Sequence, residues 1–270
     1  MGAKFSTSSK KRQARQSSSQ RQNQFQTNSG SSDGSVMRFG RKFHDVSSSA
    51  YWFPNDDEEI DRLVGQHFAL KTLFRGNVVE KCRESVPLEQ GALVLDVGCG
   101  PGTWLMDMAT EYPCSNFIGV DMCDIFPTNI RPSNVSFQVA NVLERLPFPD
   151  NTFDFVNMRL FIIALRKEQW PTVIKELYRV LKPGGYLQSV ECGMLERGND
   201  FIVWAGQVFK DTIFSRGQEP HVASQLPTLQ QNAGFIIEHY ETKDIYLGKP
   251  SEDTIDGRAQ PYFCSLLFQM

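Results

Sequence analysis

Eleven residues, Val94-Leu-Asp-Val-Gly-Cys-Gly-Pro-Gly-Thr-Trp104, decide the fold of this 270-residue chain. A short apolar run bounded by glycines is typical of a buried strand in a parallel sheet. Gly98, Gly100 and Gly102 stand at alternate positions, where they permit a sharp turn and a close approach of a ligand to the backbone. Asp96 lies near the end of the predicted strand. Its carboxylate is therefore expected to face the crevice at the carboxyl edge of the sheet, where open α/β sheets bind their ligands.

The spacing of the glycines distinguishes this turn from a dinucleotide-binding turn. The dinucleotide fingerprint is G-x-G-x-x-G, whereas this chain has G-x-G-x-G, with Thr103 where the last glycine would stand. The Asp96 carboxylate would also repel a pyrophosphate and attract an ammonium group. A nicotinamide-dependent reductase is therefore disfavoured. A glycine-rich turn without a ligand is disfavoured as well, because a turn needs only one or two glycines and no acid.

Predicted strands and helices alternate after this turn. The predicted strands are 92–97, 116–120, 135–140, 153–158, 186–191, a sixth from Phe235, and 262–268 as a seventh, antiparallel strand. The predicted helices are 56–75, 77–84, 103–111, 171–181, 201–215 and 226–232. Repeated strand–helix units imply right-handed crossovers and a parallel sheet. The predicted fold class is thus α/β, with a Rossmann-like, doubly wound, mostly parallel sheet of seven strands and N-terminal helices that act as a lid.

Several motifs in order resemble the class I methyltransferases that use S-adenosylmethionine. Their first motif reads apolar-apolar-Asp/Glu-x-Gly-x-Gly-x-Gly, and the resemblance extends over about residues 90–240. Leu146-Pro-Phe-Pro-Asp-Asn-Thr-Phe-Asp-Phe-Val156 resembles the family's loop into its fourth strand, and Leu181-Lys-Pro-Gly-Gly-Tyr-Leu187 its turn into the fifth. Upstream, Tyr51-Trp-Phe-Pro-Asn-Asp56 and Gln66-His67 resemble the fungal LaeA-like branch (methyltransferase domain 25/type 11).

The resemblance implies S-adenosylmethionine as the cofactor and gives its parts to particular residues. Asp96 would anchor the methionine amino group, Asp121 the ribose hydroxyls, and Asn141 with Val142 the adenine. The family commonly has an acid at the position of Asn141. The alternative to adenine binding is that Asn141 only caps its turn, and the alternative to ribose binding is that Asp121 is a surface residue. The predicted cofactor-binding residues are Asp96, Gly98, Cys99, Gly100, Gly102, Asp121, Met122, Asn141, Val142, Met158 and Arg159. No metal site is predicted.

Methyl transfer from a sulfonium is an in-line displacement, so the protein mainly supplies position and excludes water. Tyr51, Trp52 and Phe53 would either cover the sulfonium, with a cation–π attraction, or pack into the core. An acceptor hydroxyl or nitrogen would need a base.

The predicted catalytic residues are His67 and Glu191, with His221 and Glu58 as further candidates, and a hydrogen-bonded structural histidine is the alternative for His67. The predicted function is methyl transfer from S-adenosylmethionine to an unidentified acceptor, either a small molecule or a protein. The alternative is a methyltransferase-like regulator that binds the cofactor but acts mainly through partners.

The first part of the chain has a different composition from the rest. Residues 1–45 carry nine basic residues and two acids, a net charge of +7, whereas the whole chain has a net charge of −3. This arm is rich in Ser and Gln and poor in large apolar residues, so it cannot bury enough surface to offset its chain entropy. We predict a disordered basic tail over 1–48 and one methyltransferase domain over 49–270, with its core at 90–192.

The first six residues, Met-Gly-Ala-Lys-Phe-Ser, fit the N-myristoylation pattern M-G-x-x-x-[ST]. One acyl chain binds membranes weakly, and the following basic residues Lys10, Lys11 and Arg12 would supply a second signal. A solubilising tail, nuclear import and weak RNA binding are the alternatives, and no specific nucleic acid recognition is expected.

No run of residues is long or apolar enough for a signal peptide or a membrane span. The six cysteines lack C-x-x-C spacing, so we expect reduced thiols in an intracellular protein. The expected location is cytoplasmic, with membrane association or nuclear import as variants.

Overall fold

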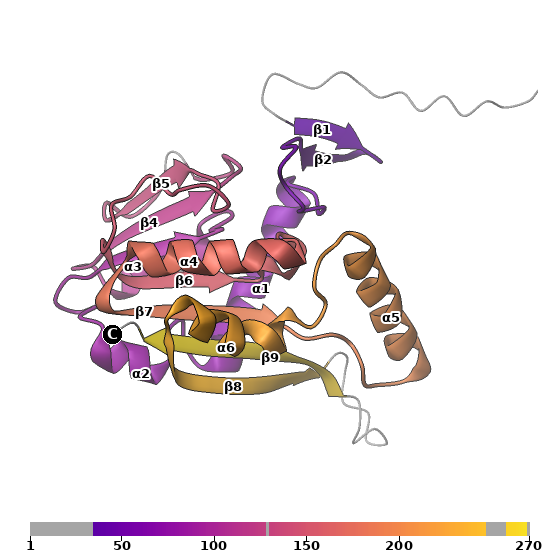
Figure 1. The fold of residues 1–270 in the computed structure, drawn as a ribbon. Coiled ribbons are helices and arrows are strands. Elements are labelled where there is room, and N and C mark those ends of the chain that lie inside the picture. Colours follow the sequence, from indigo (N-terminus) through magenta and orange to yellow (C-terminus); the bar gives the residue numbers. More distant parts are fainter. Residues whose placement is uncertain (1–34, 128–129, 247–257, 269–270) are drawn as a thin grey trace, which may run out of the picture.

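The structure, a computed structural model, describes residues 35–127, 130–246 and 258–268. Its centre is a seven-stranded sheet in the order β5-β4-β3-β6-β7-β9-β8 (Figure 1). The strands are β3 (Leu93–Val97), β4 (Asn116–Asp121), β5 (Val135–Val139), β6 (Phe153–Arg159), β7 (Leu181–Cys192), β8 (Ile236–Tyr246) and β9 (Arg258–Phe268). Neighbouring strands are parallel except for the two pairs made by β9. The predicted α/β class is confirmed, and the predicted antiparallel strand 262–268 lies within β9.

Helices cover both faces of this sheet. They are α1 (Asp57–Phe74), α2 (Glu80–Ser85), α3 (Thr103–Glu111), α4 (Trp170–Val180), α5 (Asp200–Ser215) and α6 (Val222–Ala233), with the 3-10 turns η1 (Phe161–Ile163) and η2 (Lys167–Gln169). Helices α4 and α6 lie side by side over one face (Figure 1). None of the helices in the described part of the chain combines the length and the apolar character needed to cross a bilayer.

Alternate residues of the central strands belong to two hydrophobic cores. On β3, Leu95 and Val97 pack in the core that contains α4 and α6, whereas Val94 packs in the core that contains α3. Successive side chains of a strand point to opposite faces of its sheet. Trp170 anchors the first core and Trp104 the second, each with 1% of its surface exposed. The apolar run on β3 is thus explained by a layer of helices on each side.

Helix α1 has strong signals at both ends. Asp56 caps its first turn by accepting a hydrogen bond from the Glu59 backbone N–H at 3.1 Å, and the acidic residues that follow suit the positive end of the helix dipole. The helix ends at Arg75, which has a left-handed conformation (φ 59°) and donates its backbone N–H to Lys71 and Thr72. The observed helix lies within the predicted range 56–75.

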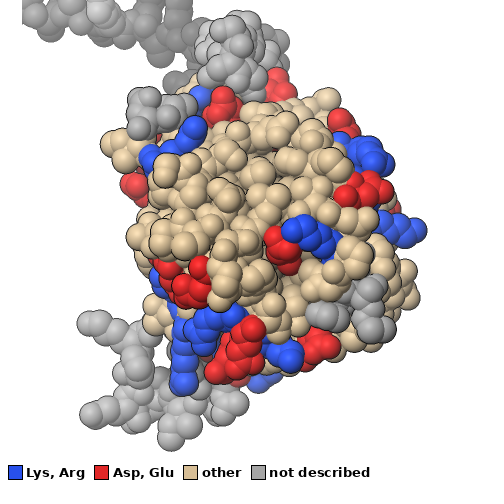
Figure 2. All heavy atoms as spheres, turned by 90° about the vertical axis from the view of Figure 1, so that its left-hand side faces the viewer, with Lys and Arg blue, Asp and Glu red and all other residues tan. Residues whose placement is uncertain are grey.

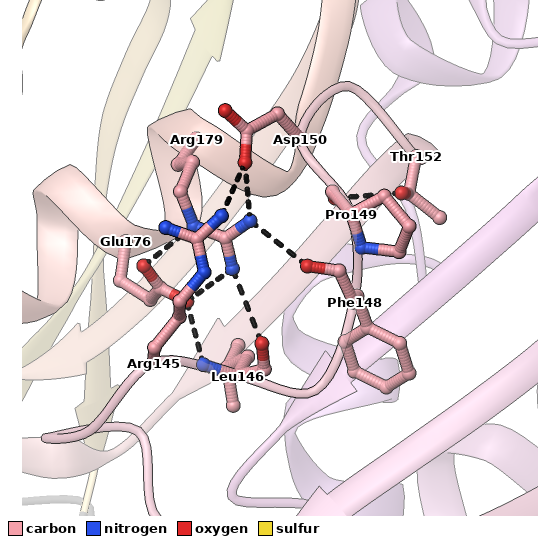
Figure 3. A network of polar contacts seen from close by, with 8 residues as sticks. All are labelled: Arg145, Leu146, Phe148, Pro149, Asp150, Thr152, Glu176 and Arg179. Atoms are coloured by element: carbon pink, nitrogen blue, oxygen red, sulfur yellow. Dashed lines mark hydrogen bonds and ion pairs between the residues drawn. The ribbon is translucent and has the colours of Figure 1, made fainter.

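The loop between β5 and β6 is held by an arginine from α4 (Figure 3). The Arg179 guanidinium donates to the backbone oxygens of Phe148 (2.8 Å) and Leu146 (3.2 Å) and to the Asp150 carboxylate (2.7 Å). Glu176, one turn earlier, accepts from Arg179 and from the Leu146 backbone N–H at 2.6 Å. The hydrogen bond to Glu176 raises the pKa of Arg179, so the guanidinium stays charged. This network fixes the entry of the chain into β6, whose far end reaches the site.

A hairpin that was not predicted precedes α1. Its strands are β1 (Ser35–Arg38) and β2 (Arg41–His44), which pair antiparallel. Phe39 and Gly40 form its turn with positive φ angles of 52° and 76°, as a two-residue hairpin turn requires. The Arg41 guanidinium binds the Asp56 carboxylate at 2.6 Å and so ties the hairpin to the start of α1. The prediction of disorder over 1–48 is therefore wrong for residues 35–48, and residues 1–34 lie outside the described residues.

The side of the molecule turned away from the hairpin and α5 mixes charges of both signs. In Figure 2, acidic and basic side chains alternate around a broad uncharged area. This view shows no patch of a single charge sign on the residues drawn in colour. The features that bear on function lie instead at the carboxyl ends of the parallel strands.

Candidate active site

A cavity of about 360 Å³ lies at the carboxyl ends of β3, β4 and β6. Its floor is formed by residues 96–101 and 120–123 and its side by residues 140–143 and 159–165. Its cover comes from the residues before α1 and from α1 itself, including Tyr51, Phe53, Glu59, Leu63 and His67. This is the crevice in which open α/β sheets bind ligands.

Two glycines of the turn after β3 are required by packing as well as by backbone conformation. Gly98 and Gly102 have φ angles of 63° and 74°, which disfavour other residues. A side chain on Gly98 would collide with the ring of Phe161, and one on Gly102 with the ring of Phe137. At Gly100, by contrast, an added Cβ would meet only Leu63, at 3.9 Å. The bare backbone at Gly100 is therefore an open cradle on the cavity floor, under the lid helix.

Asp121 connects the end of β4 to this turn. Its carboxylate accepts the Gly100 backbone N–H at 2.9 Å and the Cys123 backbone N–H at 3.0 Å, and it lines the cavity. Burial raises the pKa of Asp121, against the effect of these two hydrogen bonds. A carboxylate has about four acceptor sites. Asp121 can therefore hold the glycine turn and still accept hydroxyl groups from a ligand.

Asp96 is the most deeply placed acid of the cavity, with 3% of its surface exposed. Its Oδ1 accepts from Asn157 Nδ2 on the neighbouring strand β6 at 2.7 Å. Burial raises the pKa of Asp96 to about 6, although the positive charge of Arg159 opposes that shift. A buried carboxylate of this kind gains from a cationic ligand, because an opposite charge favours the ionised form.

The side chain of Asn141 is engaged in its own turn. Its amide oxygen accepts the Leu143 backbone N–H at 3.1 Å, and its NH₂ group donates to Glu144 at 3.2 Å. Asn141 and Val142 still line the cavity. Asn141 thus makes the capping hydrogen bonds that were the alternative to adenine binding. Its role in binding adenine stays a prediction.

Most of the predicted cofactor residues come together on this cavity. The predicted residues on its wall are Asp96, Gly98, Cys99, Gly100, Asp121, Met122, Asn141, Val142 and Arg159. Gly102 and Met158 are not among the described residues that line it. Gly102 lies against Phe137, and Met158, 1% exposed, points into the core with α4 because neighbouring strand residues alternate between faces.

His67 and Glu191 are both held by the fold. His67, 3% exposed, borders the cavity, and its Nε2 lies 3.0 Å from Asp107 Oδ2 on α3. Burial lowers the pKa of His67, although the hydrogen bond to Asp107 opposes that shift. Glu191, 1% exposed, accepts the backbone N–H groups of Phe161 (2.5 Å) and Ile162 (3.2 Å) and does not line the cavity. Burial raises the pKa of Glu191 to about 8.

The further base candidates lie elsewhere. His221 is at the start of α6, with its Nε2 3.9 Å from Glu196, and the Glu58 side chain is 80% exposed beside Arg41. Neither is among the described residues that line the cavity.

The aromatic residues before α1 divide between the two roles considered for them. Tyr51 and Phe53 border the cavity. Trp52 packs instead: its indole N–H donates to Gln218 at 3.2 Å, and the Arg216 guanidinium lies 4.8 Å from its ring centre.

Several cavity residues were missed by the sequence analysis. His44 from the hairpin, Glu59 from α1, Phe161 from η1 and Phe209 from α5 all line the cavity. The turn dipeptide Phe39-Gly40 between short segments with apolar residues was the available signal for the hairpin. Phe209 carried no signal, because only the tertiary fold brings α5 to the lid.

Comparisons with known proteins agree with this geometry. The family model described as "Methyltransferase domain" matches residues 94–185. The chain is 31% identical over 216 residues to secondary metabolism regulator LAE1 of Cochliobolus heterostrophus, covering 76% of this chain and 68% of that protein. It is 32% identical over 198 residues to methyltransferase str3 of Strobilurus tenacellus, covering 72% and 69%.

Solved structures share the fold. A SAM-dependent methyltransferase from Methanosarcina mazei matches with a TM-score of 0.53 and 19% identity over 72% of this chain and 98% of that one. One from Aquifex aeolicus matches with a TM-score of 0.50 and 19% identity over 80% and 99%.

The chain belongs to the class I S-adenosylmethionine-dependent methyltransferases, on their LaeA-like branch. Its cofactor is S-adenosylmethionine, and the reaction that its family indicates is methyl transfer from that cofactor to an acceptor that is not identified. The residues present fit the cofactor. A buried acid suits its ammonium group, the open cradle at Gly100 suits its bent chain, and Asp121 offers acceptors for hydroxyl groups.

Proposed function

We propose that this chain is an active methyltransferase that modifies a small, largely apolar acceptor. The observation that carries the proposal is a single covered cavity in which Asp96, Asp121 and the Gly100 cradle face the same space. Residues before α1 and on α1 line it on the lid side, and Phe161, Ile163 and Phe209 add apolar wall. A covered, apolar space suits a small molecule better than a protein surface.

The predicted roles of the cofactor-binding residues stand as part of this proposal. Asp96 would hold the methionine ammonium, Asp121 the ribose hydroxyls, and Asn141 with Val142 the adenine. When bound, S-adenosylmethionine supplies a methyl group that its sulfonium has already activated. The chain's own contribution is to orient both ligands and to exclude water, which the lid residues Tyr51 and Phe53 would do.

We propose positioning roles for His67 and Glu191 in place of direct proton transfer. His67 and Lys71 both lie on α1 and both bind Asp107 on α3, at 3.0 Å and 2.7 Å. They would therefore clamp the lid helix to the helix that follows the glycine turn. Glu191 accepts two backbone N–H groups of η1 and would hold that wall of the cavity in place.

The test of activity is release of S-adenosylhomocysteine. Full-length protein is incubated with S-adenosylmethionine labelled in its methyl group and with fractionated apolar extracts, and both products are followed. Labelled organic-phase product that is lost in an Asp96→Ala variant supports the proposal. Cofactor binding without turnover on any small-molecule or protein fraction would favour the second candidate function, a methyltransferase-like regulator that acts through partners. The observation behind this second candidate is the similarity to LAE1, which is named a secondary metabolism regulator.

We also propose that the chain associates weakly with the cytoplasmic face of membranes. The basic arm, with Lys10, Lys11 and Arg12, would bind anionic lipid headgroups, and acylation of Gly2 would add a second anchor. Helix α5 supports the proposal because Phe201 and Trp204 on it are 67% and 60% exposed. Sedimentation with anionic and with neutral vesicles tests membrane association, and we expect the protein in the pellet of the anionic vesicles. Its absence from both pellets would count against membrane association and would favour nuclear import as the role of the basic arm.

A further inference from the structure

A row of buried polar side chains crosses the middle of the sheet on an otherwise apolar face. Asp96 on β3 is paired with Asn157 on β6, and Asn157 is paired with Gln188 on β7. The three residues are 3%, 0% and 3% exposed. The residues two positions earlier on these strands share this face and are apolar core residues: Val94, Phe155 and Tyr186. Buried polar groups cost stability unless they are hydrogen-bonded, so three of them in register call for a role.

The hydrogen bonds of this row have one fixed direction. Gln188 Nε2 donates to the Asn77 backbone oxygen at 2.9 Å, and Gln188 Oε1 accepts the Val79 backbone N–H at 3.1 Å. Because a backbone oxygen only accepts and a backbone N–H only donates, these two contacts fix the orientation of the Gln188 amide. Gln188 Nε2 also donates to Asn157 Oδ1 at 3.2 Å, so Asn157 must present its NH₂ group to Asp96, whose Oδ1 accepts it at 2.7 Å.

The far end of the row is joined to the lid. The Asn77 side chain donates to Asp107 Oδ2 on α3 at 2.8 Å. The same carboxylate binds His67 and Lys71 of helix α1, at 3.0 Å and 2.7 Å. Asp96 is thus held, through two amides, by the segment that connects α1 to α2, and this segment is itself held by the helix that follows the glycine turn.

The charge state of Asp96 depends on this row. Burial raises the pKa of Asp96 to about 6, and the positive charge of Arg159 and the hydrogen bond from Asn157 both oppose that shift, whereas the negative charge of Asp121 adds to it. The other titratable or charged groups that face the same cavity from the glycine turn and from α1 are Cys99, Glu59, Arg62 and His67. Removing the Asn157 donor therefore favours the protonated form of Asp96, which offers no charge to an ammonium group.

We propose that Asn157 and Gln188 are positioning residues of the cofactor site: Gln188 orients Asn157, and Asn157 orients the Asp96 carboxylate toward the ammonium group of the cofactor. This inference rests on the proposed role of Asp96 and adds two residues that do not line the cofactor cavity. An amide suits the position of Asn157, because it stabilises the carboxylate without neutralising it. A carboxylate has about four acceptor sites, so one bond from Asn157 leaves sites for the ligand.

The pH dependence of cofactor binding tests these roles. Isothermal titration of the full chain with S-adenosylmethionine is carried out from about pH 5 to 7.5, where the ligand keeps its ammonium group. The affinity of the wild type should fall below about pH 6, where Asp96 gains a proton. In Asn157→Leu the fall should begin about one pH unit higher or more, since a hydrogen bond to a charged group changes an ionisation equilibrium about tenfold or more.

The second variant tests whether Gln188 acts through Asn157. Gln188→Met should move the onset of the fall in the same direction by a smaller amount. The double variant should match Asn157→Leu, because Gln188 has no route to Asp96 once Asn157 is replaced. A double variant that shows the sum of both shifts would overturn the role of Gln188 as the residue that orients Asn157.

Asn134→Leu and Gln230→Met are the matched controls, since each also removes a hydrogen-bonded amide. Asn134 donates to the Ser115 backbone oxygen at 2.9 Å, and Gln230, 0% exposed on α6, donates to Ser189 at 3.1 Å. Neither lines the cavity, so both controls should keep the pH profile of the wild type.

Two results would overturn the inference and leave the cofactor assignment standing. One is a wild-type affinity that stays constant over this pH range, and the other is an onset that moves in neither Asn157→Leu nor Gln188→Met. If Asn157→Leu does not fold, the wild type and Gln188→Met still decide. Absence of binding by the wild type at every pH would contradict the proposed function itself.

Discussion

Replacing Asp121 by alanine perturbs a contact that serves both the fold and the site. The carboxylate accepts two backbone N–H groups, from Gly100 at 2.9 Å and from Cys123 at 3.0 Å. Each hydrogen bond contributes about 0.5–1.5 kcal/mol net. We therefore expect the unfolding free energy to fall by roughly 1–3 kcal/mol. The glycine turn should loosen without loss of the sheet, because β3 and β4 remain paired.

Binding of the cofactor should weaken further in this variant. A charged acceptor for the ribose hydroxyls contributes roughly 1.5–3 kcal/mol, which is about 10- to 150-fold in Kd. Isothermal titration with S-adenosylhomocysteine measures this, at a temperature where circular dichroism shows the variant to be folded. Asp121→Asn keeps one oxygen acceptor and should lie between the two.

Asp124→Ala is the control for this experiment. Asp124 is exposed three residues further on and is not among the described residues that line the cavity. It should bind the ligand as the wild type does. If folded Asp121→Ala binds within about twofold of the wild type, the role given to Asp121 is wrong.

Further predictions concern stability, pH and the tail. Burial raises the pKa of Glu191 to about 8, so the folded protein holds its proton where the unfolded chain has lost it, and stability falls as pH rises from about 5 to 8. Glu191→Gln keeps an acceptor for the η1 N–H groups and should flatten that fall in melting temperature; parallel curves for both proteins would refute this. Arg179→Met should lower the unfolding free energy in urea by about 2–4 kcal/mol, because it leaves Glu176 without its ion-pair partner and two loop carbonyls without their donor; an unchanged midpoint would contradict the network's role. Gly102→Ala should lower the unfolding free energy clearly more than Gly184→Ala, since both glycines have a positive φ but only an added Cβ at Gly102 meets a ring, that of Phe137. Equal losses of unfolding free energy would exclude a contribution from the contact with Phe137. Mass spectrometry of the N-terminal peptide from a eukaryotic host should show a C14 acyl group on Gly2, and an unmodified or acetylated terminus would remove that prediction.

The fold and the position of the site were largely accessible from the sequence. The predicted helix 103–111 coincides with α3. The predicted glycine turn, together with Asp96 and Asp121, forms the floor of the cavity. Such features are local, because an apolar run, a glycine turn and a helix follow one another along the chain. Their meeting at one edge follows from the rules of parallel sheets.

What could not be predicted depends on tertiary contacts. Helix α2 begins at Glu80 and not near Asn77, because Asn77 is occupied with Asp107 through its side chain and with Gln188 through its backbone oxygen. Helix α6 begins at Val222, earlier than predicted, with Pro227 inside it. The strand-end rule found Met158 and Arg159 but could not tell which of the two faces the cavity.

The sequence also did not reveal whether the side chain of an acid near a strand end reaches the cavity. Glu191 stands one residue before the end of β7, at the edge of the sheet where the site lies, yet its carboxylate accepts backbone N–H groups of η1 and does not line the cavity. An acid near a strand end can bind either a ligand or the backbone of a neighbouring loop, and the conformation of that loop decides between the two. Here Leu160 adopts a left-handed conformation (φ 60°) and η1 follows directly.

A crystal structure of the full chain grown with S-adenosylhomocysteine tests the central claim most directly. We predict one ligand in the cavity, with its amino group at Asp96, its ribose at Asp121 and its chain against the bare backbone of Gly100. Density for the ligand elsewhere, or an empty cavity at millimolar ligand together with no heat of binding, would contradict the claim that this strand-end crevice holds the cofactor.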